Sequence, residues 1–204
     1  NQALDIAIQI DNKKQIVACH KQLYYLCREF KRMMNERGDE QASTLFFRES
    51  LLHEMYFSEK PRLAELTVRY EALRCDIMQQ YYMNKDYDNV IRIATSLDFH
   101  DDADPNASCL VYYYKAQAYV KLENYPMAKE AFFRELELRK KYLGWEEEDT
   151  ILACQNLGVL HSFCNEREEA LACFREAYGH EVKKNGEDSE MAQKLLQYIS
   201  VVES

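Results

Sequence analysis

Three side chains of the kind that bind transition metals occur at helical spacing in the last third of the chain. Cys154, His161 and Cys164 follow one another at intervals of seven and three residues, which places them near one face of a helix. Thiolate and imidazole groups are the usual ligands of Zn²⁺, and Cys173 would supply a fourth ligand. Zinc binding is one interpretation of this set, and packing between helices is the other.

Hydrolytic chemistry has less support in the sequence. His53 and Glu54 begin a string like that of the zinc proteases, but Phe57 stands where the second histidine would be. The chain contains neither a glycine-rich phosphate loop nor a GxSxG nucleophile motif. Asp101 and Asp102 fall in a polar segment, where solvation explains them. We therefore expect a protein that is not an enzyme and has no cofactor.

Composition narrows the classes of partner. The formal charge is −9, and no basic stripe exists to follow a phosphate backbone, so we expect no nucleic acid partner. No run of 18 apolar residues occurs, and residues 1–10 lack the basic start and long apolar centre of a secretory signal, so we expect no membrane partner. The seven cysteines form no CxxC pair, which favours thiols in a reducing, cytoplasmic compartment. Because the chain does not start with Met, we expect it to be part of a longer protein.

An internal repeat organises the elements that would position any site. Five Gly and three Pro in 204 residues, with 47% hydrophobic content, predict an all-α chain. One stretch repeats after 42 residues, a period typical of stacked helical pairs that cannot bury their apolar faces alone. The aligned positions are Tyr119, Tyr125, Ala128, Phe132 and Glu135 with His161, Arg167, Ala170, Phe174 and Ala177.

The same layout extends upstream and predicts one repeat domain over residues 1–204. Residues 3–10 have helical spacing and are expected to be the second helix of an incomplete repeat. Polar residues around Pro105 predict a loop that ends one helix and caps the next. The predicted repeats are 11–56, 66–98, 108–140 and 149–185, followed by a terminal helix over 189–203.

The repeats resemble the tetratricopeptide repeat (TPR) family. Matching residues in the best copy are Leu157, Gly158, Ala170, Phe174 and Ala177. The resemblance implies a right-handed superhelical array of antiparallel helix pairs, a TPR-like α-solenoid, whose small residues let the paired helices cross closely. It also implies packing roles for Cys154 and His161, which occupy slots held by Trp and Tyr in the family, so we expect no metal.

Within that family, the stretch over residues 135–160, which contains a lengthened second helix, is similar to the kinesin light chain type of repeat. There, a Leu-Gly followed by an acidic stretch joins consecutive units, as Leu143 and Gly144 are followed here by Asp149. The next helix usually starts with paired Asn in that type, whereas this chain has Gln155-Asn156 once and Lys194-Leu195 later.

A groove formed by the first helices of each pair would bind a peptide or helix of another protein. Amide side chains can donate to and accept from a peptide backbone, and Tyr supplies contact area with few rotors. The alternative is a solvated face with no partner. The candidates are Lys21, Tyr25, Arg28, Asp76, Gln79, Tyr82, Tyr113, Gln117, Lys121, Gln155, Asn156, Ser162 and Lys194.

Some TPR domains hold the C-terminal carboxylate of a chaperone with a set of Lys, Arg and Asn residues. The matching positions here carry Cys75, Gln79, Tyr114, Leu152 and Asn156, so we expect no chaperone tail as partner. The sequence therefore favours a protein–protein interaction scaffold or adaptor. Two alternatives stay open, which are a structural or self-association segment of a larger assembly and a peptide-sensing regulatory domain of a multidomain protein.

Overall fold

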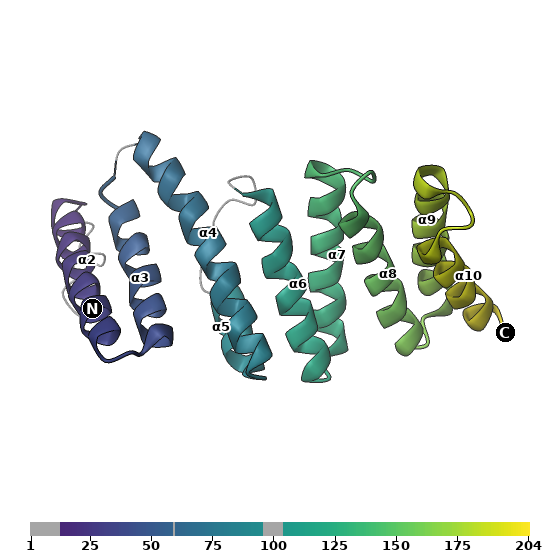
Figure 1. Ribbon diagram of the computed structural model, residues 1–204, viewed down its shortest axis with the longest axis horizontal. Coiled ribbons are helices and arrows are strands. Elements are labelled where there is room, and N and C mark those ends of the chain that lie inside the picture. Colours follow the sequence, from purple (N-terminus) through teal and green to yellow (C-terminus); the bar gives the residue numbers. More distant parts are fainter. Residues whose placement is uncertain (1–12, 59, 96–103) are drawn as a thin grey trace. The chain divides into compact units, whose positions relative to one another are not determined.

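The computed structural model describes residues 13–58, 60–95 and 104–204, and its helices carry the labels of Figure 1. The described residues are all-α, with no strand among them. The predicted helix over residues 3–10 and the pair Asp101 and Asp102 lie outside the described residues. The helices are α2 (Lys13–Glu36), α3 (Glu40–Met55), α4 (Lys60–Met83), α5 (Tyr87–Thr95), α6 (Pro105–Lys121), α7 (Tyr125–Tyr142), α8 (Glu148–Phe163), α9 (Arg167–Asn185) and α10 (Glu190–Glu203).

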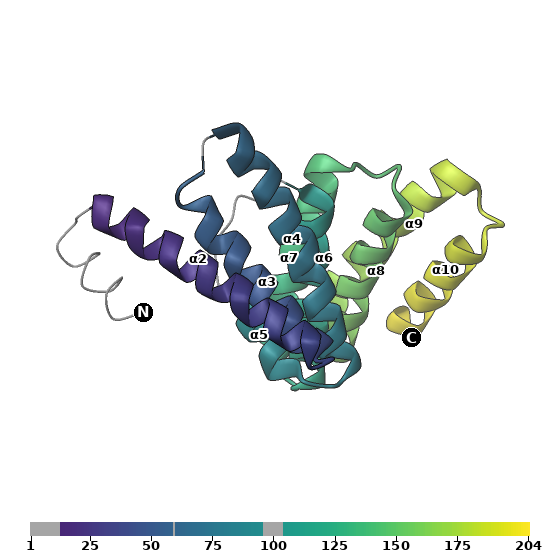
Figure 2. The same ribbon diagram turned by 60° about the vertical axis from the view of Figure 1, so that its left-hand side comes forward.

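The chain divides into two compact units, Asn1–Ile77 and Met78–Ser204, and the division falls inside α4. In the first unit, α2 packs along α3. In the second unit, each helix from α5 to α10 contacts the next one along the chain, as Figures 1 and 2 show from two directions. None of the described helices has the length and apolar character that a membrane crossing requires.

Capping side chains determine where several helices begin. Asp104 accepts the backbone N–H of Ala107 at 3.0 Å, and Pro105 occupies the first turn, where a missing N–H costs nothing. α6 therefore starts before the boundary predicted at residue 108, and α4 starts at Lys60 rather than at residue 66. Side chains that cap α3, α7 and α10 in the same way belong to Asp39, Asn124 and Ser189.

The turns inside successive helix pairs share one backbone geometry. Lys85, Glu123 and Asn165, at intervals of 38 and 42 residues, each have a φ near +60°. In each turn the N–H of the next residue donates back to a carbonyl in the last turn of the first helix, at 2.9 Å. This left-handed residue followed by a six-to-one hydrogen bond is a Schellman closure, which satisfies carbonyls at the helix end. The same turn thus recurs at the spacing of the sequence repeat.

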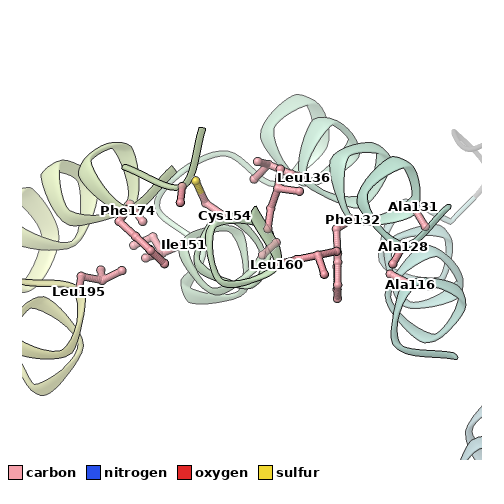
Figure 3. Packing of buried hydrophobic residues seen from close by; sticks show 14 residues of the cluster. Ala116, Ala128, Ala131, Phe132, Leu136, Ile151, Cys154, Leu160, Phe174 and Leu195 are labelled. Carbon is pink, nitrogen blue, oxygen red and sulfur yellow. The ribbon is translucent and has the colours of Figure 1, made fainter. Parts of the chain in front are cut away.

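The core of the second unit contains small residues where helices cross. Ala116, Ala128 and Ala170 are completely buried, each in a different helix. Figure 3 shows Phe174 with Leu195 where α9 and α10 meet. Equivalent positions of the sequence repeat are therefore buried at equivalent places in the structure.

Gly158 marks the closest approach between α8 and α9. A Cβ added there would lie 2.8 and 2.9 Å from two ring carbons of Phe174 and 3.0 Å from the Cβ of Cys173. Phe174 is 1% exposed and stacks on Tyr198, with ring centres 5.1 Å apart, so the ring has little room to move. Close crossing at this point depends on the missing side chain.

We predict that Gly158→Ala destabilises the protein relative to Gly179→Ala. Alanine favours the helix at both positions, but an added Cβ at Gly179 meets nothing within 4 Å. Overpacking at Gly158 should lower the free energy of unfolding by about 1–3 kcal/mol relative to the Gly179 variant. Urea unfolding followed by circular dichroism measures the difference. Equal stabilities of the two variants would show that the contact is not restrictive.

Candidate functional site

Cys154 and His161, two of the possible zinc ligands, form hydrogen bonds with nearby residues of the chain. Cys154 is completely buried, and its Sγ donates to the carbonyl oxygen of Cys173 at 3.3 Å. His161 lies near the end of α8, with its Nδ1 2.6 Å from Glu166 Oε2. Within the described parts of the chain, no group of three or more His, Cys, Asp or Glu residues is arranged to hold a metal ion.

His53 belongs to a ring cluster in the first unit. Its Nδ1 is 2.9 Å from His20 Nδ1, and the His20 ring stacks on Tyr56 with ring centres 3.6 Å apart. Burial, together with His53, lowers the pKa of His20 to about 4, and burial also lowers the pKa of His53. Both imidazoles are thus neutral at pH 7, and the hydrogen bond between them joins α2 to α3.

A cavity of about 230 Å³ opens in the second unit between α6, α7 and α8. Two of its lining side chains remain open to solvent, since Phe163 is 66% exposed and Val159 is 41% exposed. Exposed apolar surface beside a cavity is typical of a binding site. The full lining is Val120, Tyr125, Phe132, Val159, Leu160 and Phe163, with the amides of Gln117 and Asn156.

Helical spacing brings the lining of α8 together. Asn156, Val159, Leu160 and Phe163 follow a pattern of three, four and seven residues, so they share one face of the helix. Tyr125, at the start of α7, lies beside Phe163 with ring centres 5.1 Å apart. The cavity is therefore framed by residues whose directions are set by regular helices.

An ionic network ties the turn of the α8–α9 pair to α7. Lys129 Nζ donates to Glu166 Oε1, while His161 lies against the other carboxylate oxygen. These hydrogen bonds, from Lys129 first and then His161, lower the pKa of Glu166. The carboxylate of Glu166 stays ionised, which holds three helices together near the end of α8 that carries Phe163.

Tyrosine rings connect two further predicted residues. Tyr82 and Tyr113 both lie against Tyr114, with ring centres 5.8 and 5.4 Å from it. Burial raises the pKa of the Tyr113 hydroxyl, and Gln117, four residues further along α6, opposes this shift. Tyr82 and Tyr113 are therefore linked through Tyr114, whereas Gln117 and Asn156 are the predicted residues in the lining of the cavity.

Gln155 corrects the predicted groove. Its side chain is 4% exposed, and its Oε1 has no hydrogen-bond partner within the described residues. Successive residues on a helix point about 100° apart, so a helix that turns Asn156 toward the cavity turns Gln155 inward. The prediction that Gln155 lies on an accessible groove surface is wrong.

Three other predicted residues of the second unit lie outside the cavity lining. Lys121 is exposed at the end of α6, and Ser162 is half-buried on α8. Lys194 is exposed on α10, with its Nζ 5.9 Å from the centre of the Tyr198 ring. These side chains are available for other contacts but do not belong to the cavity.

The remaining predicted residues lie on α2 and α4. Lys21, Tyr25 and Arg28 are exposed on α2 in the first unit. Asp76 and Gln79 are exposed on α4, on either side of the division between the two units. Each of these residues is accessible to solvent, and their role in binding stays a prediction.

The residues predicted from the sequence are polar side chains and tyrosines, so they do not include the apolar lining of the cavity. Val159 and Phe163 occur one turn apart, on the same helical face as Asn156. Apolar side chains at positions three and seven residues after a predicted groove residue such as Asn156 are the signal that would have identified them. What the sequence does not reveal is which apolar side chains the neighbouring helices leave uncovered.

Glu135 is a buried carboxylate in the second unit. It is 1% exposed, its Oε1 accepts from Arg139 Nε at 2.8 Å, and its Oε2 has no hydrogen-bond partner among the described residues. Arg139 also donates to Asp149 at 3.2 Å. Burial raises the pKa of Glu135 to about 7, although Arg139 opposes the shift. Near pH 7 this side chain is therefore only partly ionised.

We predict that Glu135 makes folding less favourable as the pH rises. Its pKa is higher in the folded state than in the unfolded chain, so its contribution to stability is largest below about pH 4.5 and falls until about pH 7. The free energy of unfolding, taken as wild type minus Glu135→Gln, should drop by about 3 kcal/mol over this range.

Urea unfolding at a series of pH values measures this difference. Glu137→Gln is the matched control, since Glu137 is exposed on the same helix. For the control, the difference from wild type should change little with pH. A constant difference for Glu135→Gln as well would show that folding does not perturb this carboxyl group.

Family models and curated proteins give no match for this chain. A scan against protein-family models finds no family for this chain, and a search of curated proteins finds no similar sequence. The function is therefore inferred from the cavity, the helix pairing and the repeated turns.

Proposed function

We propose that this protein is a non-enzymatic adaptor that binds a short segment of another protein, with one apolar side chain of that segment in the cavity between α6, α7 and α8. The proposal depends on one observation, which is an apolar cavity bordered by two amide side chains and by solvent-exposed Val159 and Phe163. Such a site offers shape and hydrogen bonds but no group for covalent chemistry.

The size of the cavity favours a peptide side chain over a cofactor. Sites for drug-sized molecules and cofactors typically enclose about 300–1,000 Å³. The cavity here, at about 230 Å³, is smaller and suits one aliphatic or aromatic side chain. An anchor of this kind in a preformed pocket is a common source of peptide affinity.

Gln117 and Asn156 supply the polar part of the site. Each amide can donate and accept at the same time, which matches the alternating N–H and C=O groups of an extended backbone. They come from α6 and α8, one from each side of the cavity. A bound segment would lie across the cavity with its backbone held at both sides. Micromolar affinity, about 8 kcal/mol, is the expected range for a single anchor of this type.

The proposal includes a TPR-like array of helix pairs. Support comes from the turns, whose left-handed residues recur at 38 and 42 residues, and from the glycine that brings α8 against α9. In such an array the first helices of successive pairs, including α6 and α8, form the binding surface. The proposed compartment is the reducing cytoplasm, where seven cysteines with no CxxC pair are compatible with a thiol state.

We predict that Val159→Glu weakens peptide binding at least about tenfold, a loss of about 1.4 kcal/mol. The new carboxylate would have to be desolvated when an apolar side chain enters the cavity. Peptides would be selected from a random displayed library with the wild-type chain, synthesised with a fluorescent label, and titrated by anisotropy. Asn156→Ala should weaken the same peptides several-fold through the loss of backbone hydrogen bonds.

Val201→Glu is the matched control. Val201 is 71% exposed on α10 and does not line the cavity, so its variant should bind the peptides as the wild type does. Equal affinity of the Val159 and Val201 variants would overturn the proposal. Self-association of the wild type in light scattering, abolished by Val159→Glu, would instead identify the cavity as an assembly surface.

A further inference from the structure

Two cysteines lie at the crossing of α8 and α9. Cys154 lies in α8 and is 0% exposed, whereas Cys173 lies in α9 and is partly exposed. The Sγ of Cys154 is 3.3 Å from the backbone oxygen of Cys173, so the buried thiol lies directly against the residue that carries the second thiol. Figure 3 shows Cys154 beside the core side chains at this crossing.

Close approach of the two helices brings these two residues together. Gly158 follows Cys154 by one helical turn, and a Cβ built on it would lie only 3.0 Å from the Cβ of Cys173. A disulfide needs two Cβ atoms about 3.5–4.5 Å apart, which requires backbones that come this near. The helix contact therefore brings the backbone of α9 at Cys173 close to the stretch of α8 that carries Cys154.

The surroundings give the two sulfurs different roles. The neighbouring Cys154 thiol lowers the pKa of Cys173, and nearby Lys140 acts in the same direction. Burial and Glu176 oppose this shift. The pKa of Cys154 is raised, first by its hydrogen bond with Cys173 and then by burial. Cys173 is thus the accessible nucleophile, and Cys154 is its protonated neighbour.

We propose that Cys154 and Cys173 form a reversible disulfide when the protein meets hydrogen peroxide or an organic hydroperoxide, and that this bond links α8 to α9. The pair is a modification site within the fold, separate from the cavity. Its formation needs no cofactor, since the hydroperoxide is the oxidant.

The reaction balances in two steps. The Cys173 thiolate attacks one peroxide oxygen and the O–O bond breaks, which leaves a sulfenic acid on Cys173. The leaving group is hydroxide from hydrogen peroxide, or alkoxide from an organic hydroperoxide, and it takes a proton to become water or an alcohol. The Cys154 sulfur then attacks the Cys173 sulfur and the S–O bond breaks. The leaving hydroxide takes the proton from Cys154 and departs as water. Two thiols are oxidised, and one hydroperoxide is reduced.

Peptide mapping of the oxidised chain tests the proposal. The whole chain would be treated with a few equivalents of hydrogen peroxide. It would then be denatured in the presence of N-ethylmaleimide, which blocks the remaining thiols. It would then be digested without reductant by a protease that cuts after Arg167, between the two cysteines. The expected product is a peptide pair joined through Cys154 and Cys173, lighter by two hydrogens and lost on treatment with dithiothreitol.

Variants separate the two steps. In Cys154→Ala, peroxide should leave Cys173 as a sulfenic acid that dimedone traps. Cys164→Ala is the matched control, since Cys164 is also partly exposed, and the 154–173 link should persist in it. Oxidation of Cys173 with Cys154 still open to alkylation, a link between separate chains, or no oxidation of Cys173 would each overturn the proposal. If Cys154→Ala does not fold, as judged by circular dichroism, the wild-type map still decides the outcome.

Discussion

The close contact between α8 and α9 is the constraint on which the rest of the second unit depends. Because Gly158 has no side chain, Phe174 can lie directly against α8, and its ring also stacks on Tyr198 of α10. One contact thereby connects three consecutive helices. It also brings Cys173 against Cys154, so the thiol pair is a consequence of the same crossing.

The turn of the α8–α9 pair has the same backbone geometry as the turn of the neighbouring α6–α7 pair. With a left-handed residue at the same point in each pair, α6 and α8 enter their turns in the same way. Gln117 of α6 and Asn156 of α8 then border one cavity, in which Phe132 of α7 is a buried part of the lining. The cavity follows from helix pairing and is framed by regular elements, which favours a preformed site over one that must order on binding.

The sequence could predict much of the fold because helical signals are local. Apolar spacing, capping residues such as Asn124, and the polar segment around Pro105 are readable without knowledge of the neighbouring helices. The site was less predictable, since it depends on which helix covers which face. Gln117 and Asn156, which were predicted for a groove, line the cavity, whereas Gln155, which was predicted for the same surface, is buried.

Glu135 shows the same division between local pattern and tertiary environment. The repeat aligns it with Ala177, and both are buried, yet only the structure shows that the carboxylate is paired with Arg139 and that its pKa is raised by burial. The sequence by itself determined the helical class, the period and the turns, because these follow from the preferences of nearby residues. Only the tertiary structure decided the cavity, the thiol pair and the buried charge, because each requires side chains from helices that meet through packing.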